Sequence, residues 1–292
     1  GCIVVGYTNG WGGGDRNVQL VKTDSLGNTE WVKTYGGANE DKGNSVQQTT
    51  DGGYIVAGTT FSFGNGTINS IYLIKTDFNG DTLWTRTYGG DYVNEGYSVV
   101  QTSDGGYILG GTSKLSVGGY NLYIIKTDNT GDTLWTKAFG SGLVHSILQT
   151  LDGGYVLCGT GTYLIKMDVS GDTLWSKKYG IGLWSSDNII KQTPDSGFVI
   201  AGNLGPNICL IKTNSTGDVQ WAKIYDGVND VGAYGISLTS DDGYIVSGYT
   251  GSSLDTNGQD MYLIKTNSTG DIVWTKSYGG QIDERAYGVQ QS

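Results

Sequence analysis

Short hydrophobic runs alternate with glycine-rich polar turns along the whole chain. Tyr54–Gly58 (YIVAG) and Tyr72–Thr76 (YLIKT) are typical runs. They are rich in Val, Ile, Tyr and Thr, which favour β-strands, and the turns between them hold Gly, Asn and Asp, which tolerate positive φ. No segment keeps a 3.6-residue apolar period, so the pattern predicts an almost purely β protein.

A sequence motif that ends in tryptophan recurs along the chain. Its clearest copies are Tyr72–Trp84 (YLIKTDFNGDTLW) and Tyr262–Trp274 (YLIKTNSTGDIVW). A second motif follows, as in Ser45–Thr49 and Asp51–Gly58. Each unit therefore predicts four strands: A (SVQQT), B (YIVAG), C (YLIKT) and D, which carries the tryptophan. The repeated tryptophans are Trp31, Trp84, Trp135, Trp175, Trp221 and Trp274, with spacings of 53, 51, 40, 46 and 53 residues.

Four strands per unit at this period are typical of a β-propeller blade. Strands B and C are almost continuously apolar, as expected where both faces of each sheet are covered by neighbouring blades. The chain starts in a strand B, Gly1–Gly6, and stops in a strand A, Gly288–Ser292. We therefore expect one all-β, six-bladed propeller with four antiparallel strands per blade, closed by the N- and C-terminal strands in one blade. The predicted blades are 1–37 with 286–292, 44–90, 97–140, 145–180, 188–226 and 234–280.

These motifs resemble the tandem repeats of secreted and surface-anchored bacterial and archaeal propellers. The strand C–turn–strand D motif is also similar to the tryptophan-docking repeat of quinoprotein-type propellers. The resemblance covers the whole chain and implies a propeller fold and export.

Residues that recur in every predicted blade are expected to have a structural role rather than a catalytic or ligand-binding one. We expect the tryptophans to pack between blades; a ring of ligand-stacking sites is the alternative. Two lysine series should pair with turn acids such as Asp77, Asp81, Asp128 and Asp132. The first series is on strand C, at Lys22, Lys75, Lys126, Lys166, Lys212 and Lys265. The second is on strand D, at Lys33, Arg86, Lys137, Lys177, Lys223 and Lys276.

Composition and net charge exclude some classes of binding partner. Of 292 residues, 50 are glycine, and the formal net charge is −10, which argues against nucleic acid and anionic lipid as partners. No apolar run reaches the ~18 residues of a membrane helix, so we expect no membrane insertion. The start, Gly1–Val4, is neither an initiator Met nor a signal n-region, so any targeting segment would lie outside this sequence. With the resemblance, this predicts an extracellular or cell-surface protein.

The sequence offers few candidate residues for metal binding or thiol chemistry. The loop residues Asp255, Asn257 and Asp260 carry alternating oxygen side chains that could bind calcium; an unliganded polar loop is the alternative. No other cofactor is expected. The three cysteines lie in different predicted blades without zinc spacing, which predicts buried free thiols.

A catalytic interpretation rests on one residue. His145 is the only histidine and opens strand A of the fourth predicted blade. At a channel mouth it could be a general base, and a quinone- or calcium-dependent sugar-oxidising enzyme is the alternative function. No acid–base–cation cluster surrounds it in the sequence, so a solvated loop histidine and a non-catalytic protein are expected.

The variable loops point to binding. The A–B and C–D turns are nearly uniform, whereas the B–C and D–A connections differ between blades. A binding site is expected on that variable face, with a glycan or a surface protein as ligand. Aromatic rings that only cap the channel, or self-assembly through outer blade edges, are the alternatives. The predicted ligand-binding residues are Trp11, Trp184, Tyr92, Phe61, Asp41, Asp283 and Glu284.

Overall fold

The computed structural model describes residues 1–9, 16–64, 68–90, 92–114, 118–160, 163–180, 189–226, 231–251, 258–280 and 283–290. No helix occurs in these ranges. The strands divide between two compact units, Gly1–Gln149 and Thr150–Ser292, and each unit is described by itself. This confirms the prediction of an all-β protein.

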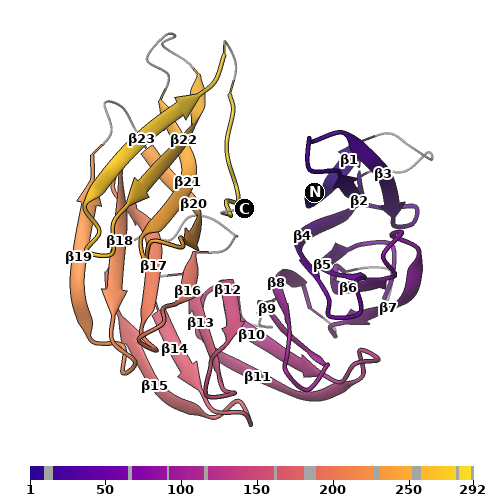
Figure 1. The fold of residues 1–292 in the computed structure, drawn as a ribbon. Helices are drawn as coiled ribbons and strands as arrows, with labels where there is room; N and C mark the ends of the chain where they lie inside the picture. Colours follow the sequence, from indigo (N-terminus) through magenta and orange to yellow (C-terminus); the bar gives the residue numbers. More distant parts are fainter. Residues whose placement is uncertain are drawn as a thin grey trace. The chain divides into compact units, whose positions relative to one another are not determined.

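The first unit contains three complete antiparallel sheets (Figure 1). Their strand orders are β1-β2-β3, β4-β5-β6-β7 and β11-β10-β9-β8. The strands are β1 (Ile3–Asn9), β2 (Arg16–Thr23), β3 (Thr29–Tyr35), β4 (Asp41–Gln48), β5 (Tyr54–Thr60), β6 (Ser70–Thr76), β7 (Thr82–Tyr88), β8 (Asn94–Gln101), β9 (Tyr107–Lys114), β10 (Tyr120–Thr127), β11 (Thr133–Ser141) and β12 (Val144–Gln149).

The second unit continues the same pattern. The boundary between the units falls in the turn after β12, inside a sheet of order β12-β13-β14-β15, and the orders β16-β17-β18-β19 and β20-β21-β22-β23 follow. The strands are β13 (Tyr155–Gly159), β14 (Tyr163–Met167), β15 (Thr173–Lys178), β16 (Ile190–Gln192), β17 (Phe198–Leu204), β18 (Asn207–Thr213), β19 (Val219–Tyr225), β20 (Val231–Leu238), β21 (Tyr244–Gly251), β22 (Gln259–Thr266) and β23 (Ile272–Tyr278).

Two details differ from the sequence prediction. The first sheet has three strands, and residues 286–290 form no strand. Instead, the C-terminal segment lies beside β20 and β21 (Figure 1), with the Ala286 amide donating to the Gly248 carbonyl over 3.2 Å. In addition, strand A begins at Asp41, Asn94 and Val231, three residues earlier than the repeated motif predicted.

The core lies in strands B and C, as predicted. Every residue of β5 and β6 is buried. Side chains of neighbouring sheets interlock: Ile55, Leu73 and Ile71 of the second sheet pack with Val99 and Leu109 of the third. Because both faces of each sheet are covered, these strands carry no polar face.

Four of the six repeated tryptophans pack between adjacent sheets within a unit, as expected, whereas Trp274 is 38% exposed. Gly80, in the turn between β6 and β7, has a φ of +79°. A Cβ on it would lie 2.9 Å from the Trp31 ring and 2.8 Å from Lys33 Cγ, so glycine is required for this contact. Trp31 also meets Tyr54 edge-on, with ring centroids 5.8 Å apart. The same contact recurs at Trp84–Gly131, Trp175–Gly217 and Trp221–Gly270.

Two polar contacts accompany each packed tryptophan. Lys33 Nζ lies 2.6 Å from Asp81 Oδ1, and the Tyr35 hydroxyl donates to the Gly80 carbonyl over 2.6 Å. The strand D cations thus pair with turn acids, as predicted. The equivalent ion pairs are Arg86–Asp132, Lys177–Asp218 and Lys223–Asp271.

The strand C lysines have a different partner from the one predicted. Lys75, almost fully buried, pairs with Asp51 of the A–B turn, not with an acid of the C–D turn. Asp51 also accepts from the Thr49 hydroxyl at 2.5 Å and the Gly53 amide at 3.0 Å. The same pairing joins Lys126–Asp104, Lys166–Asp152, Lys212–Asp195 and Lys265–Asp241, whereas Lys22 pairs with Glu30.

We expect Tyr35→Phe to lower the free energy of unfolding by about 1 kcal/mol, because the Gly80 carbonyl loses a buried donor. Urea denaturation of the wild type and the variant measures this. Tyr92→Phe is the control, since Tyr92 is an exposed tyrosine. Equal losses in both variants would contradict a specific role for the inter-sheet hydrogen bond.

Stability should fall in acid, between about pH 4 and pH 2. Burial raises the pKa of Asp51, but hydrogen bonds from Thr49, Lys75 and Gly53 outweigh it and lower the pKa to about 2. A carboxyl with a lowered folded-state pKa stabilises the protein above its unfolded pKa, and this contribution is lost as the pH falls through the folded value. The pKa values of Asp104, Asp152, Asp195 and Asp241 are lowered too. Denaturation midpoints across this range test the prediction, and Asp51→Asn should flatten the slope.

Candidate functional site

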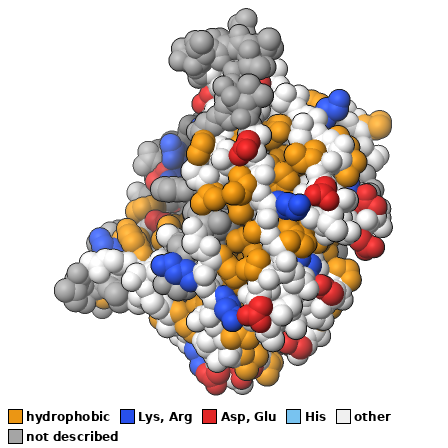
Figure 2. All heavy atoms as spheres, turned by 90° about the vertical axis from the view of Figure 1, so that its left-hand side faces the viewer, with side chains coloured by type: hydrophobic (Ala, Val, Ile, Leu, Met, Phe, Trp, Pro, Cys, Tyr) orange, Lys and Arg blue, Asp and Glu red, His pale blue; other side chains and the backbone are white. Residues whose placement is uncertain are grey.

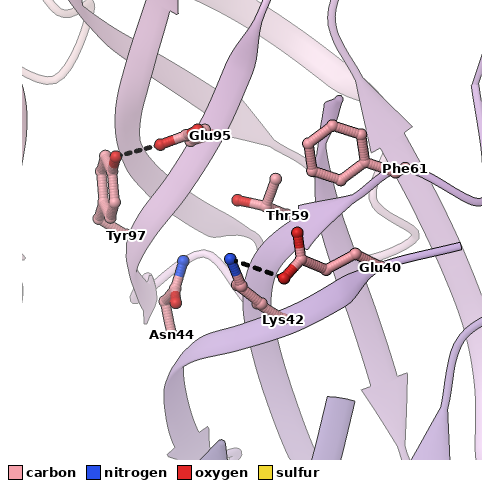
Figure 3. Close-up of a pocket in the computed structure, with 7 residues that line it drawn as sticks. All are labelled: Glu40, Lys42, Asn44, Thr59, Phe61, Glu95 and Tyr97. Atoms are coloured by element: carbon pink, nitrogen blue, oxygen red, sulfur yellow. Dashed lines mark hydrogen bonds and ion pairs between the residues drawn. The ribbon is translucent and has the colours of Figure 1, made fainter. Parts of the chain in front are cut away.

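A cavity of about 250 Å³ lies in the first unit, among strands β4, β5 and β8 (Figure 3). Lys42 and Asn44 come from β4, Thr59 from β5, and Glu95 and Tyr97 from β8. Glu40 immediately precedes β4 and Phe61 immediately follows β5. Strands A and B of neighbouring sheets thus supply most of the lining, and the B–C and D–A connections supply the rest.

Two cations hold the Glu40 carboxylate. Arg16 Nη1 lies 3.1 Å and Lys42 Nζ 3.0 Å from Glu40 Oε1. Both cations also lie over the Tyr7 ring, the Arg16 Cζ at 4.8 Å and the Lys42 Nζ at 5.9 Å from its centroid. These contacts fix the Lys42 ammonium at one side of the cavity and offset the charge of Glu40.

Neutral donors hold the second carboxylate. Asn69 Nδ2 donates to Glu95 Oε1 over 3.0 Å, and the Tyr97 hydroxyl donates to Glu95 Oε2. Burial raises the pKa of Tyr97, and its hydrogen bond to Glu95 raises it further. The Tyr97 hydroxyl therefore keeps its proton, and the Glu95 carboxylate is held by Asn69 and Tyr97 with no ion-pair partner among the described residues.

One position of strand B that lines the cavity carries a smaller residue than its equivalent in the sixth sheet. Thr59 pairs with Lys42, as Tyr249 pairs with Gly232 in the sixth sheet. There the Tyr249 ring covers Gly232 so closely that a Cβ on Gly232 would overlap it. Threonine in place of this tyrosine leaves the space open in the second sheet.

The equivalent region of the sixth sheet is aromatic and filled. The Tyr234 and Tyr287 rings stack with centroids 4.7 Å apart, and Tyr234 lies 5.4 Å from Tyr249. The Arg285 guanidinium lies over the Tyr249 ring at 5.6 Å. One structural position thus carries an open, charged cavity in the first unit and a closed aromatic cluster in the second.

Of the seven predicted ligand-binding residues, only Phe61 lines the cavity. Tyr92 and Asp283 are exposed elsewhere, and Glu284 is half-buried in the second unit. Trp11 and Trp184 lie outside the described residues. The prediction for Asp41 is wrong, because strand β4 starts at this residue and the side chain is fully buried. Asp41 Oδ2 accepts from the Gly37 amide at 2.9 Å and the Ser62 hydroxyl at 2.6 Å.

The predicted ligand-binding residues did not include the other six that line the cavity, which are Glu40, Lys42, Asn44, Thr59, Glu95 and Tyr97. All lie within or beside strands A and B, at positions that vary between repeats, and this variation was the available signal. The sequence prediction compared only the loops and therefore did not use this variation.

The structure places several predicted metal, catalytic and thiol residues in other surroundings than the sequence predicted. Asp255 and Asn257 lie outside the described residues, and Asp260 is buried. The described residues contain no group of three or more His, Cys, Asp or Glu side chains arranged to hold a metal ion. His145 is buried within β12, not in a solvated loop. Cys158 and Cys209 are buried free thiols as predicted, but Cys2 is exposed.

The strands that carry the repeated tryptophans expose an apolar side chain just before the tryptophan. Leu83, Leu134, Leu174 and Val273 precede Trp84, Trp135, Trp175 and Trp274, and each is more than half exposed. Figure 2 shows hydrophobic side chains interspersed with acidic and basic ones on one such face. In the described part of the chain, no helix is long and apolar enough to cross a membrane.

Comparison with known proteins identifies the fold. No family model matches the chain. The regulatory protein FlaEY of Caulobacter vibrioides is 27% identical over 154 residues, which are 44% of this chain and 16% of FlaEY. The chain therefore spans about a sixth of that relative's length.

Three solved structures resemble nearly the whole chain. BamB from Moraxella catarrhalis has a TM-score of 0.51 at 15% identity, covering 92% of this chain and 72% of BamB. The β-propeller domain of Myceliophteria thermophila Cps50 (Swd1) has a TM-score of 0.58 at 11% identity, covering 92% and 84%. Sqt1 from Chaetomium thermophilum has 0.55 at 13% identity, covering 94% and 67%. Together with the six repeated sheets, these likenesses show a six-bladed β-propeller whose first blade has three strands.

Proposed function

We propose that this propeller is a non-catalytic binding scaffold, and that the cavity lined by Phe61, Lys42 and Glu95 binds one residue of a glycan. The observation that carries the proposal is the contrast between equivalent positions. Thr59 leaves open a space that Tyr249 fills in the sixth sheet. The second sheet thus has an open, charged cavity where the sixth sheet is filled, and this difference favours a binding role for the cavity.

The lining suits a sugar by its mixture of groups. Phe61, 39% exposed, offers an aromatic face against which the apolar face of a sugar ring can pack. Glu95 can accept hydroxyl hydrogen bonds, and Lys42 and the Asn44 amide can donate them. The volume lies just below the roughly 300–1,000 Å³ of pockets for drug-sized ligands, which suits one sugar residue.

Phe61→Ala and Glu95→Gln should each weaken glycan binding at least tenfold, because removing an anchor from a binding site costs about 2 kcal/mol. A glycan array finds the ligand, and titration calorimetry measures the affinity. Thr59→Tyr should also block binding, since it copies the residue that fills the sixth sheet. Tyr92→Ala is the matched control, because Tyr92 is an exposed aromatic residue outside the cavity lining.

Unchanged affinity in the cavity variants with unchanged melting temperature would contradict the proposed site. If a protein binds instead of a sugar, and the same variants weaken its binding, the site stands and only the class of ligand changes.

The proposal also includes a cell-surface or extracellular location. The resemblance of the repeats to exported propellers and the acidic composition support this, and fractionation of the native source tests it.

We further propose that the C-terminal segment supplies the strand missing from the first blade. The support is positional. The Glu284 amide donates to the Gln259 carbonyl at 2.6 Å, just as Asn94 at the start of β8 donates to the Asn69 carbonyl at 3.1 Å. The segment therefore lies against the sixth sheet as strand A of a following blade would.

Deletion of residues 286–292 should then destabilise the whole protein, because the first sheet would lose its fourth strand and the ring its closure. Thermal melting followed by calorimetry measures the effect. A single cooperative transition at clearly lower temperature is expected. A truncated chain that melts like the full chain would show that the termini do not close the ring.

A further inference from the structure

The charged side chains that line the cavity do not all offset one another. Glu40 and Glu95 are acidic, and Lys42 is basic. Lys42 Nζ lies 3.0 Å from Glu40 Oε1, so the charges of these two residues offset each other. Arg16, the second cation on Glu40, does not belong to the lining. The charge that remains in the lining is therefore that of Glu95.

Neutral donors hold the Glu95 carboxylate in place. Asn69 Nδ2 donates to Glu95 Oε1, and the Tyr97 hydroxyl donates to Glu95 Oε2. These two bonds orient the carboxylate, but neither brings a positive charge to it. A carboxylate oxygen has two lone pairs, so each oxygen of Glu95 can accept a further hydrogen bond. A ligand that enters the cavity thus meets an anion that is already oriented.

Two hydroxyl oxygens belong to the same lining. The Tyr97 hydroxyl donates its proton to Glu95 and keeps its lone pairs as acceptors. Thr59 of β5 also lines the cavity, and Figure 3 shows its hydroxyl oxygen turned toward the side on which Tyr97 lies. A carboxylate and two hydroxyl oxygens match the three donors of a protonated primary amine.

The carboxylate is a departure from the repeat. Glu95 in the third sheet occupies the same register position as Lys42 in the second sheet and Gly232 in the sixth. One structural position thus carries an acid, a base or no side chain, so the fold does not require the acid there. A carboxylate that the fold does not require, in the lining of a cavity, is suited to select a ligand by its charge.

We propose that the cavity selects an amino sugar, whose protonated amine binds Glu95; this inference rests on the glycan site proposed above. The sugar ring packs on Phe61, and the ammonium group donates to Glu95, Tyr97 and Thr59. A neutral sugar would bring Glu95 only a hydroxyl and would leave its charge unpaired where the ligand has displaced water, which is costly. A sugar with a carboxylate would place a second negative charge beside Glu95.

Calorimetric titration of the full chain with three oligosaccharides of the same length and linkage tests this selection. They are oligomers of glucosamine, N-acetylglucosamine and glucose, which differ in the group at C2, and the pH is kept where the amine is protonated. The wild type should bind the glucosamine oligomer at least about tenfold more tightly than the other two, because charge-assisted hydrogen bonds are roughly twice as strong as neutral ones. Glu95→Gln should remove this preference.

Two controls separate the site from a general attraction between a cationic sugar and an acidic protein. Glu30→Gln removes the same charge from an exposed residue outside the cavity lining, and it should keep the preference. Thr59→Tyr keeps every charge but places at the cavity the larger residue of the sixth sheet, so it should abolish binding of all three oligosaccharides. If Glu95→Gln folds poorly, the wild type and Thr59→Tyr still decide.

Equal affinity of the wild type for the three oligosaccharides, or a preference that survives in Glu95→Gln, would overturn the selection of an amino sugar and leave the glycan site standing. The same loss of preference in Glu30→Gln, or tight binding of the glucosamine oligomer by Thr59→Tyr, would overturn it too. If the glucosamine oligomer does not bind the wild type, the inference is wrong, whereas the glycan array decides separately whether the cavity binds another sugar.

Discussion

The contact between a strand D tryptophan and the glycine of the next C–D turn sets the spacing between adjacent sheets in each unit. The indole occupies the space that a Cβ on that glycine would need, so the two sheets approach to ring contact at Trp31–Gly80 and Trp221–Gly270. The tyrosine hydroxyl and the lysine–aspartate pair then fix the sliding register of one sheet on the next. Because the glycine has a positive φ, the turn and the packing require the same residue.

This outer frame leaves the inner strands free to differ. Strand B contributes its first residue to the tryptophan contact, as Tyr54 does to Trp31, so positions farther along strands A and B can change without loss of this contact. Lys42 in one repeat corresponds to Gly232 in another, and Thr59 corresponds to Tyr249. The open cavity of the first unit and the aromatic cluster of the second arise from such exchanges at one structural position. The strand D contacts are uniform because they hold neighbouring sheets together, and strands A and B can vary because the contacts do not depend on most of their residues.

The repeat made most of the fold predictable. Strand positions, buried B and C strands and tryptophan packing follow from periodicity and residue type, because the same local chemistry recurs with each unit. The partner of Lys75 did not follow, because both Asp51 and Asp77 lie in adjacent turns and only the register decides between them. Asp41 was misjudged for a related reason. Strand A extends three residues beyond its repeated motif, so a residue that resembled loop chemistry is buried. The cavity was not predictable, since residues of three different strands line it and only their arrangement in space brings them together.

Departures from the repeat differ in whether the structure compensates them. Arg285 replaces a carboxylate, Glu95, yet its guanidinium lies over Tyr249, and its partner Asp283 is 3.8 Å away. That exchange is complete within the protein. The exchange of Asn17 for Asp260 is less complete, because Asp260 Oδ1 is buried without a partner, as Asp41 Oδ1 is in the second sheet. A buried oxygen that accepts no hydrogen bond costs free energy of folding, which the packing around it has to offset. The repeat thus tolerates unsatisfied polar atoms where the packed frame around them is strong enough.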